Sequence, residues 1–78
     1  MTSKEMIAQA RAHWQEVNPK LYKKMEKRGD LEKELIASAD LTRTEMDYNK
    51  MVGMSEQESW QAARELFILC NPAKNYTI

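Results

Sequence analysis

The chain has 78 residues and no net charge, and 31% of its residues are charged while 42% are hydrophobic. A chain of this size buries only about 60% of its unfolded surface, so it supports one small domain. The chain has a single cysteine, which excludes an internal disulfide, and a single histidine. One residue of each type is too few for a structural zinc site. No segment has the length and hydropathy of a membrane span or a secretory signal, so we expect a cytoplasmic protein without a membrane partner.

The zero net charge hides a polarity along the chain. Residues 1–28 contain seven Lys or Arg against three Asp or Glu, whereas residues 29–78 contain five against nine. Two interpretations stay open. Either the two halves neutralise each other in the fold, or the molecule has a bipolar surface that orients a partner by charge.

The first predicted helix begins after Thr2 and ends at Asn18. Thr2 and Glu5 have the spacing of a capping box. Asn18 precedes Pro19, and a residue before proline avoids the helical region. Apolar side chains recur between these limits at intervals of four, four and three residues, which is one face of a helix: Met6, Ala10, Trp14 and Val17.

A short basic helix is predicted over residues 19–28. Pro19 fits the first helical position, Asn18 caps it, and Gly29 provides the left-handed residue that usually ends a helix. Apolar side chains form one stripe along it: Leu21, Tyr22 and Met25. Cations crowd the rest of its surface: Lys20, Lys23, Lys24, Lys27 and Arg28.

Two further helices are predicted between residues 30 and 53. Asp30 is expected to cap the third helix, and Asp40–Leu41 is expected to break it. Thr42 and Glu45 repeat the spacing of a capping box and predict a fourth helix, which ends at Gly53. The expected inward residues of the third helix are Leu31, Leu35, Ile36 and Ala39, and the apolar residues of the fourth are Met46, Tyr48, Met51 and Val52.

A fifth helix is predicted to begin at the capping box formed by Ser55 and Glu58 and to stop at Asn71–Pro72. Its last turns are apolar on every side, so Ile68 and Leu69 belong either to the core or to an interface. No segment alternates as a strand does. We therefore expect an all-α fold, a compact array of about five short helices in a single domain over residues 1–71, followed by a C-terminal tail over residues 72–78.

The sequence offers no pattern typical of an active site. Cys70 lies in an apolar run, where a thiol keeps its proton and behaves as a small hydrophobic residue. His13 lies at the edge of the first apolar stripe, which favours a packed imidazole over a catalytic one. Glutamates two residues apart, as at 32 and 34, point to different helix faces. We expect no catalytic, metal or cofactor site, and hence no enzyme.

Three interpretations of the basic helix stay open: a solvated face, contact with an acidic protein surface, or contact with nucleic acid. A helix-turn-helix around Gly53 is disfavoured, because the helix that would read DNA begins with the acidic Ser55-Glu56-Gln57-Glu58. The candidate partner-binding residues are Lys20, Lys23, Lys24, Lys27, Arg28, Ile68, Leu69 and Tyr76.

A resemblance adds a biological context. The first half carries a basic residue and a His before a helix end, then a Tyr, a Gly and a Leu, in the segments Arg11-Ala12-His13-Trp14, Pro19-Lys20-Leu21-Tyr22, Gly29-Asp30-Leu31 and Leu35. In this pattern, residues 11–35 resemble small proteins encoded by phages and other mobile elements, including the TnpV family of transposon-encoded proteins. Residues 41–69 resemble the later part of such phage proteins. The resemblance implies an accessory protein inside a bacterial host cell that docks onto host machinery, including defence complexes.

The leading hypothesis is a non-enzymatic helical module that binds a protein partner and modulates or inhibits it. The basic helix would steer the module, and apolar residues of the fifth helix would seal the contact or a homodimer. Two alternatives remain: a nucleic-acid-binding accessory protein that uses the basic helix, and a structural component that assembles with itself.

Overall fold

The computed structural model describes residues 2–74, with only the backbone of Lys74. These residues form an all-α fold, which confirms the predicted class, but with one α-helix fewer than the expected five. The elements are α1 (Ser3–Val17), α2 (Pro19–Arg28), α3 (Leu31–Met51), α4 (Glu56–Phe67) and the short 3-10 helix η1 (Pro72–Lys74).

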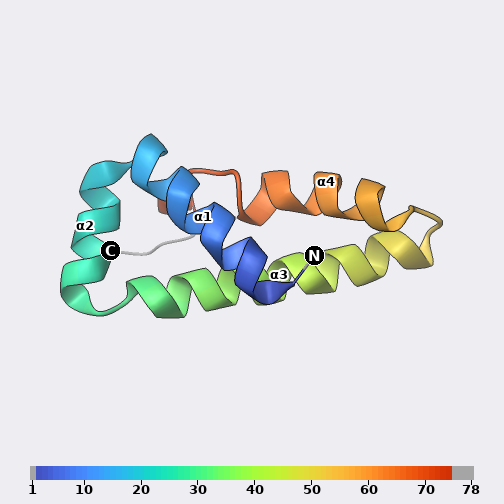
Figure 1. The fold of residues 1–78 in the computed structure, drawn as a ribbon, viewed down its shortest axis with the longest axis horizontal. Coiled ribbons are helices and arrows are strands. Elements are labelled where there is room, and N and C mark those ends of the chain that lie inside the picture. The colour runs from blue at the N-terminus through green and yellow to red at the C-terminus, as the bar shows by residue number, and fades with distance from the viewer. Residues whose placement is uncertain (1, 75–78) are drawn as a thin grey trace.

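The described molecule is elongated, with extents of 40 × 21 × 19 Å, because α3 runs along its length. Helix α4 returns antiparallel beside α3, and α1 crosses in front of the pair (Figure 1). Helix α2 stands across one end, whereas the turn between α3 and α4 forms the other end. The basic helix is therefore a terminal element of the molecule and packs only through one side.

Three predicted helix starts are confirmed by cap hydrogen bonds. The side-chain oxygens of Thr2, Asn18 and Ser55 each accept from the backbone N–H three residues further on. Ser55 completes a full capping box, because Glu58 Oε1 accepts from the Ser55 N–H at 3.1 Å. Gly29 ends α2 with φ 79°, the left-handed conformation that its position predicts.

The predicted break at Asp40–Leu41 is wrong, and the third and fourth predicted helices are one helix, α3. Thr42 caps nothing: its buried hydroxyl donates to the Ser38 carbonyl at 2.7 Å, one turn back in the same helix. No Gly or Pro lies within residues 31–51, so the segment contains no strong helix breaker.

Asp30 occupies the predicted N-cap position of α3, and its carbonyl accepts from the Glu34 N–H at 3.0 Å, but its side chain makes no cap hydrogen bond. Its dihedral angles, φ −93° and ψ −15°, are already helical, whereas a side-chain cap usually needs an extended residue. Its carboxylate lies instead 3.5 Å from Arg28 Nε and 3.8 Å from Lys33 Nζ. These ion pairs join the end of α2 to the beginning of α3.

One hydrophobic core joins all four α-helices. Trp14 Nε1 donates to the Ile68 carbonyl at 3.1 Å, which ties α1 to the end of α4. The buried apolar residues are Met6, Ala10, Trp14, Leu21, Tyr22, Met25, Leu31, Leu35, Ala39, Met46, Trp60, Ala63 and Ile68.

Four apolar residues of the predicted third and fourth helices are exposed, and one of them, Ile36, was expected to face inward. The exposed fractions are 50% for Ile36, 60% for Tyr48, 84% for Met51 and 61% for Val52. Because α3 is continuous, its buried face keeps the phase set by its first turns, and that phase turns the later apolar residues toward solvent. Ile36 follows Leu35 by one residue and lies about 100° around the axis from it, so it turns away from the core and its expected inward orientation is wrong.

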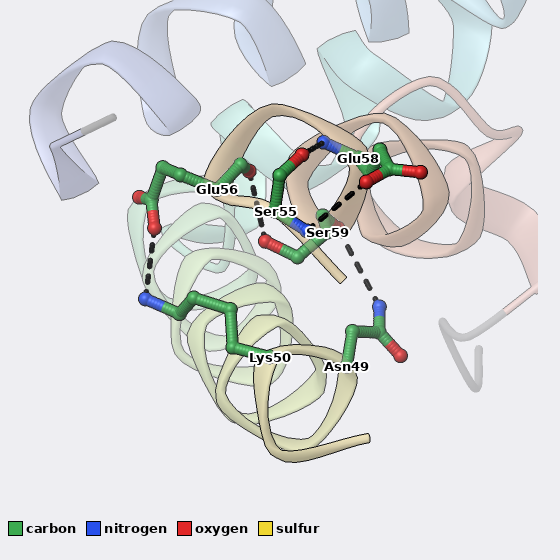
Figure 2. Close-up of polar contacts among 6 residues, drawn as sticks. All are labelled: Asn49, Lys50, Ser55, Glu56, Glu58 and Ser59. Carbon is green, nitrogen blue, oxygen red and sulfur yellow. Dashed lines mark hydrogen bonds and ion pairs between the residues drawn. The ribbon is translucent and has the colours of Figure 1, made fainter. Parts of the chain in front are cut away.

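The far end of the molecule is fixed by polar contacts between α3 and α4 (Figure 2). Asn49 Nδ2 donates to the Ser59 carbonyl at 3.5 Å, and Lys50 Nζ donates to Glu56 Oε2 at 2.8 Å. Figure 2 shows both α3 side chains reaching toward the first turns of α4. These contacts hold α4 antiparallel on α3 beyond the Gly53 turn.

The chain after α4 turns back against the start of α2. Helix α4 ends at Phe67, before the predicted stop at Asn71–Pro72. Asn71 Oδ1 accepts from Asn18 Nδ2 at 3.1 Å, and Pro72 is buried. The first residues of the predicted tail thus form η1, and the candidate Tyr76 lies outside the described residues.

Candidate protein-binding surface

Helix α2 is locked in place by its apolar side. Leu21, Tyr22 and Met25 are buried in the core, as predicted. Gln15 Nε2 of α1 donates to the Tyr22 hydroxyl at 2.9 Å, so the polar tip of this buried ring is also held. With Asn18 capping one end and Gly29 closing the other, α2 presents its remaining surface in a fixed orientation.

The exposed surface of α2 is a dense group of cations. We call it the basic face, and its residues are Lys20, Lys23, Lys24, Lys27 and Arg28. At 3.6 residues per turn and 1.5 Å per residue, the basic face spans an arc of about 140° and a length of about 12 Å. Glu26 is the single acidic residue of this helix, so the basic face carries a strong local positive charge.

The four lysines of the basic face form no ion pair with any residue within 2–74. Arg28 differs, because its Nε lies 3.5 Å from the Asp30 carboxylate. Unneutralised cations on a fixed helix produce a positive potential that attracts an acidic surface. The lysines are therefore the part of the basic face best suited to an external contact.

Shallow grooves flank α2 on both sides. One, of about 330 Å³, is lined by Gln15, Pro19, Tyr22, Lys23 and Glu26. The other, of about 270 Å³, is lined by Asn18, Lys20, Leu21, Lys24 and Ala73. Each groove has lysine on its wall, so side chains of a partner that reach beside α2 would meet positive charge.

An ion pair between α1 and α3 lies near the C-terminal end of α2. Arg11 donates a hydrogen bond to Glu32 Oε1. This bond first, and the neighbouring Tyr22 second, raise the pKa of Arg11 above its ordinary value, so the guanidinium stays charged. The pair lies beside a small groove that also includes Glu26 and Gly29 of the α2 end.

The other candidate residues are distributed differently. Ile68 is fully buried and belongs to the same core cluster as Trp14, so its side chain lies in the core and is not exposed for a partner contact. Leu69 is partly buried against the same core. The turn at residues 71–73 was not predicted to lie beside the basic face. Its Ala73 lines the same groove as Lys20 and Lys24. The Asn18–Asn71 hydrogen bond that brings it there has no local sequence signal.

Other kinds of site are absent from the part of the chain that the structure describes. Within residues 2–74, no three His, Cys, Asp or Glu side chains gather in a way that could hold a metal ion. None of the helices in that range has both the length and the hydropathy needed to cross a membrane.

Comparison of the chain with protein-family models, with curated proteins and with solved structures gave no match. The resemblance to TnpV and to small phage proteins therefore stays a prediction.

Proposed function

We propose that this chain is a non-enzymatic protein-binding module and that the basic face of α2 is its contact with an acidic surface of a partner protein. One observation carries the proposal. Four lysines without an ion pair among the described residues lie on a helix whose opposite side is locked into the core. Their backbone positions are fixed before binding, so less conformational entropy is lost on association than with a flexible basic segment.

The charge distribution favours protein recognition by steering. The basic face stands at one end of an elongated molecule, and carboxylates lie further along α3 and at the start of α4: Asp40, Glu45, Asp47, Glu56 and Glu58. Such a bipolar molecule orients its basic end toward a negative surface before contact, which raises the association rate. In the context implied by the sequence resemblance, the module is a phage or mobile-element accessory protein that modulates or inhibits host machinery, including defence complexes.

The test begins with affinity capture of the partner from the native host and its identification by mass spectrometry. The purified partner is then titrated with the wild-type chain and with Lys20→Glu/Lys24→Glu. We expect at least about a tenfold loss of affinity, equivalent to roughly 1.4 kcal/mol, mainly through a slower association rate.

The matched control carries the same change of net charge elsewhere. Lys4→Glu/Arg43→Glu alters exposed cations of α1 and α3 and should leave affinity within about twofold, because screening limits charge effects to roughly 8 Å at physiological salt. Circular dichroism should show unchanged helicity in both variants. Equal affinity of the α2 variant and the wild type would refute the proposal.

Nucleic-acid binding is a second candidate, favoured by the density of five cations on one helix face. The aromatic residue of α2, Tyr22, is buried and gives no stacking platform for bases. Labelled DNA and RNA distinguish the two functions in a salt titration. Phosphate contacts give a linear fall of log affinity with log salt, with a slope of about −0.9 per neutralised phosphate on duplex DNA. The absence of a mobility shift at low salt would exclude this candidate.

A further inference from the structure

A second surface of the molecule is apolar although it faces solvent. We call it the outer stripe of α3, and its residues are Ala37, Leu41, Thr44, Tyr48 and Met51, all exposed. Leu41 is 48% exposed, Tyr48 60% and Met51 84%. Their spacing alternates between four and three residues, which is the seam of a coiled coil, and it extends for about 21 Å along the helix.

The outer stripe is distinct from the side of α3 that packs in the core. Leu35, Thr42 and Met46 mark the buried side, which faces α1 and α4. At 100° per residue, the outer stripe lies on roughly the opposite side of the helix. The stripe is apolar except at Thr44, whose hydroxyl donates to the Asp40 carbonyl at 3.1 Å, and exposed apolar patches often mark contact sites.

Carboxylates flank the outer stripe on both sides. Asp40 and Asp47 occupy the positions next to the seam on one side, and Glu45 occupies the other. These three carboxylates form no ion pair with any residue in the described range. The stripe is therefore an apolar seam with negative edges.

The cations of the same segment point elsewhere. Arg43 Nε donates to Ser3 Oγ of α1 at 2.8 Å. Lys50 Nζ reaches Glu56 of α4 at 2.8 Å, as Figure 2 shows. The hydrogen bond to Glu56 first, and the nearby charge of Asp47 to a lesser degree, raise the pKa of Lys50, so Asp47 is partly compensated. Asp40 and Glu45, which form no ion pair within residues 2–74, keep their negative charge for a partner.

A second copy of this chain does not match the charges of the stripe. If two stripes paired antiparallel about Thr44, Asp40 of one copy would meet Asp47 of the other, and the two Glu45 side chains would face each other. In parallel pairing, Asp40 would meet Glu45 of the other copy. Like charges at these positions are destabilising. Helix α2 of another copy does not fit either, because Leu21 and Met25 are buried in its own core.

We propose that the outer stripe of α3 is the docking site for an amphipathic helix of a partner protein, about four turns long, with Lys or Arg on both sides of its apolar seam. The length of the stripe sets the length of that helix, and the carboxylate edges set its charge. This surface is independent of the basic face, since it selects a partner of opposite charge.

The probe is a pair of synthetic amphipathic peptides of four helical turns. Both carry leucine along the seam, and one carries lysine beside it where the other carries glutamate. Titrations followed by fluorescence anisotropy should show binding of the lysine peptide and at least a tenfold lower affinity for the glutamate peptide. Leu41→Ser and Tyr48→Ser should each lower the affinity for the lysine peptide by about tenfold, as expected when a central apolar anchor is lost.

Ile36→Ser is the matched control. Ile36 is 50% exposed on the same helix, close to the 48% of Leu41. It lies about 140° around the helix axis from Leu41 and therefore outside the stripe. Its replacement should change affinity by less than twofold. Asp40→Lys/Asp47→Lys should reverse the preference between the two peptides, because the edge of the seam then becomes positive.

Three results would overturn the proposal. The first is equal affinity for both peptides, and the second is an unchanged affinity in Tyr48→Ser. The third is a dimer in light scattering that Tyr48→Ser dissociates, because the stripe would then be covered by a second copy. Circular dichroism of every variant should show that these exposed substitutions leave the helices intact.

Discussion

Replacing Thr42 by valine should leave the stability of the protein almost unchanged. In α3 the Thr42 side chain is buried, and its hydroxyl donates to the Ser38 carbonyl at 2.7 Å. That carbonyl also accepts the helical backbone N–H of Thr42, so the substitution leaves no buried acceptor without a partner. Valine has the same branching and a similar helix propensity.

The expected magnitude comes from two opposing contributions. Loss of a side-chain hydrogen bond costs about 1 kcal/mol, while a buried methyl group in place of the hydroxyl contributes about 0.8 kcal/mol. The free energy of unfolding should therefore change by less than about 0.5 kcal/mol. If Thr42 capped a separate helix, the loss would be about 0.5–2 kcal/mol.

The same substitution at Thr2 is the matched control, because this residue caps α1 through a hydrogen bond from the Glu5 N–H at 3.2 Å. Urea unfolding followed by circular dichroism should show the loss of about 1 kcal/mol for Thr2→Val, a shift in melting temperature of roughly 4–8 °C. An equal loss in Thr42→Val would refute the continuous helix.

Three further outcomes are expected. Trp14→Phe should lower the free energy of unfolding by about 1–3 kcal/mol in urea titration, because the buried Ile68 carbonyl loses the Trp14 Nε1 donor. Gly29→Ala should cost about 1 kcal/mol in the same assay, since φ is 79° and the added Cβ meets no atom within 4 Å; Gly29→Asn should cost less. Hydrogen bonds from Ser55 lower the pKa of Glu58 below its ordinary value of 4.5. The capping box therefore contributes stability above pH 4.5, and this stability is lost as the pH falls. Melting temperatures measured between pH 3 and 6 should decline less with falling pH in Glu58→Gln, which keeps the hydrogen-bond acceptor without the charge.

Features that depend on a few neighbouring residues were predictable from sequence. The caps at Thr2, Asn18 and Ser55, and the left-handed Gly29, are local geometry, and the structure has each of them. The buried stripe of α2 also follows from spacing within ten residues. For the same reason the position and composition of the basic face could be deduced before the fold was known.

Features that depend on the phase of a long helix were not predictable. Thr42 and Glu45 have the spacing of a capping box, but that pattern also occurs inside a helix, where packing decides. The predicted break concealed the single buried face that runs through residues 31–49 of α3. The outer stripe of α3 was therefore hidden by the same error that gave one helix too many, and the contact of the C-terminal turn with Asn18 depends on tertiary structure alone.

The two proposed surfaces favour an adaptor over a simple blocker. The basic face of α2 selects a negative surface, whereas the outer stripe of α3 repels such a surface through Asp40, Glu45 and Asp47, so the same surface of a partner cannot bind both. α2 stands at one end of a molecule 40 Å long, and the stripe extends toward the other end. The two surfaces share no side chains, so substitutions in them should act additively. We therefore expect Lys20→Glu/Lys24→Glu combined with Tyr48→Ser to bind the acidic partner as weakly as Lys20→Glu/Lys24→Glu alone. The same combined variant should bind the basic helix as weakly as Tyr48→Ser alone, because each ligand contacts only its own surface.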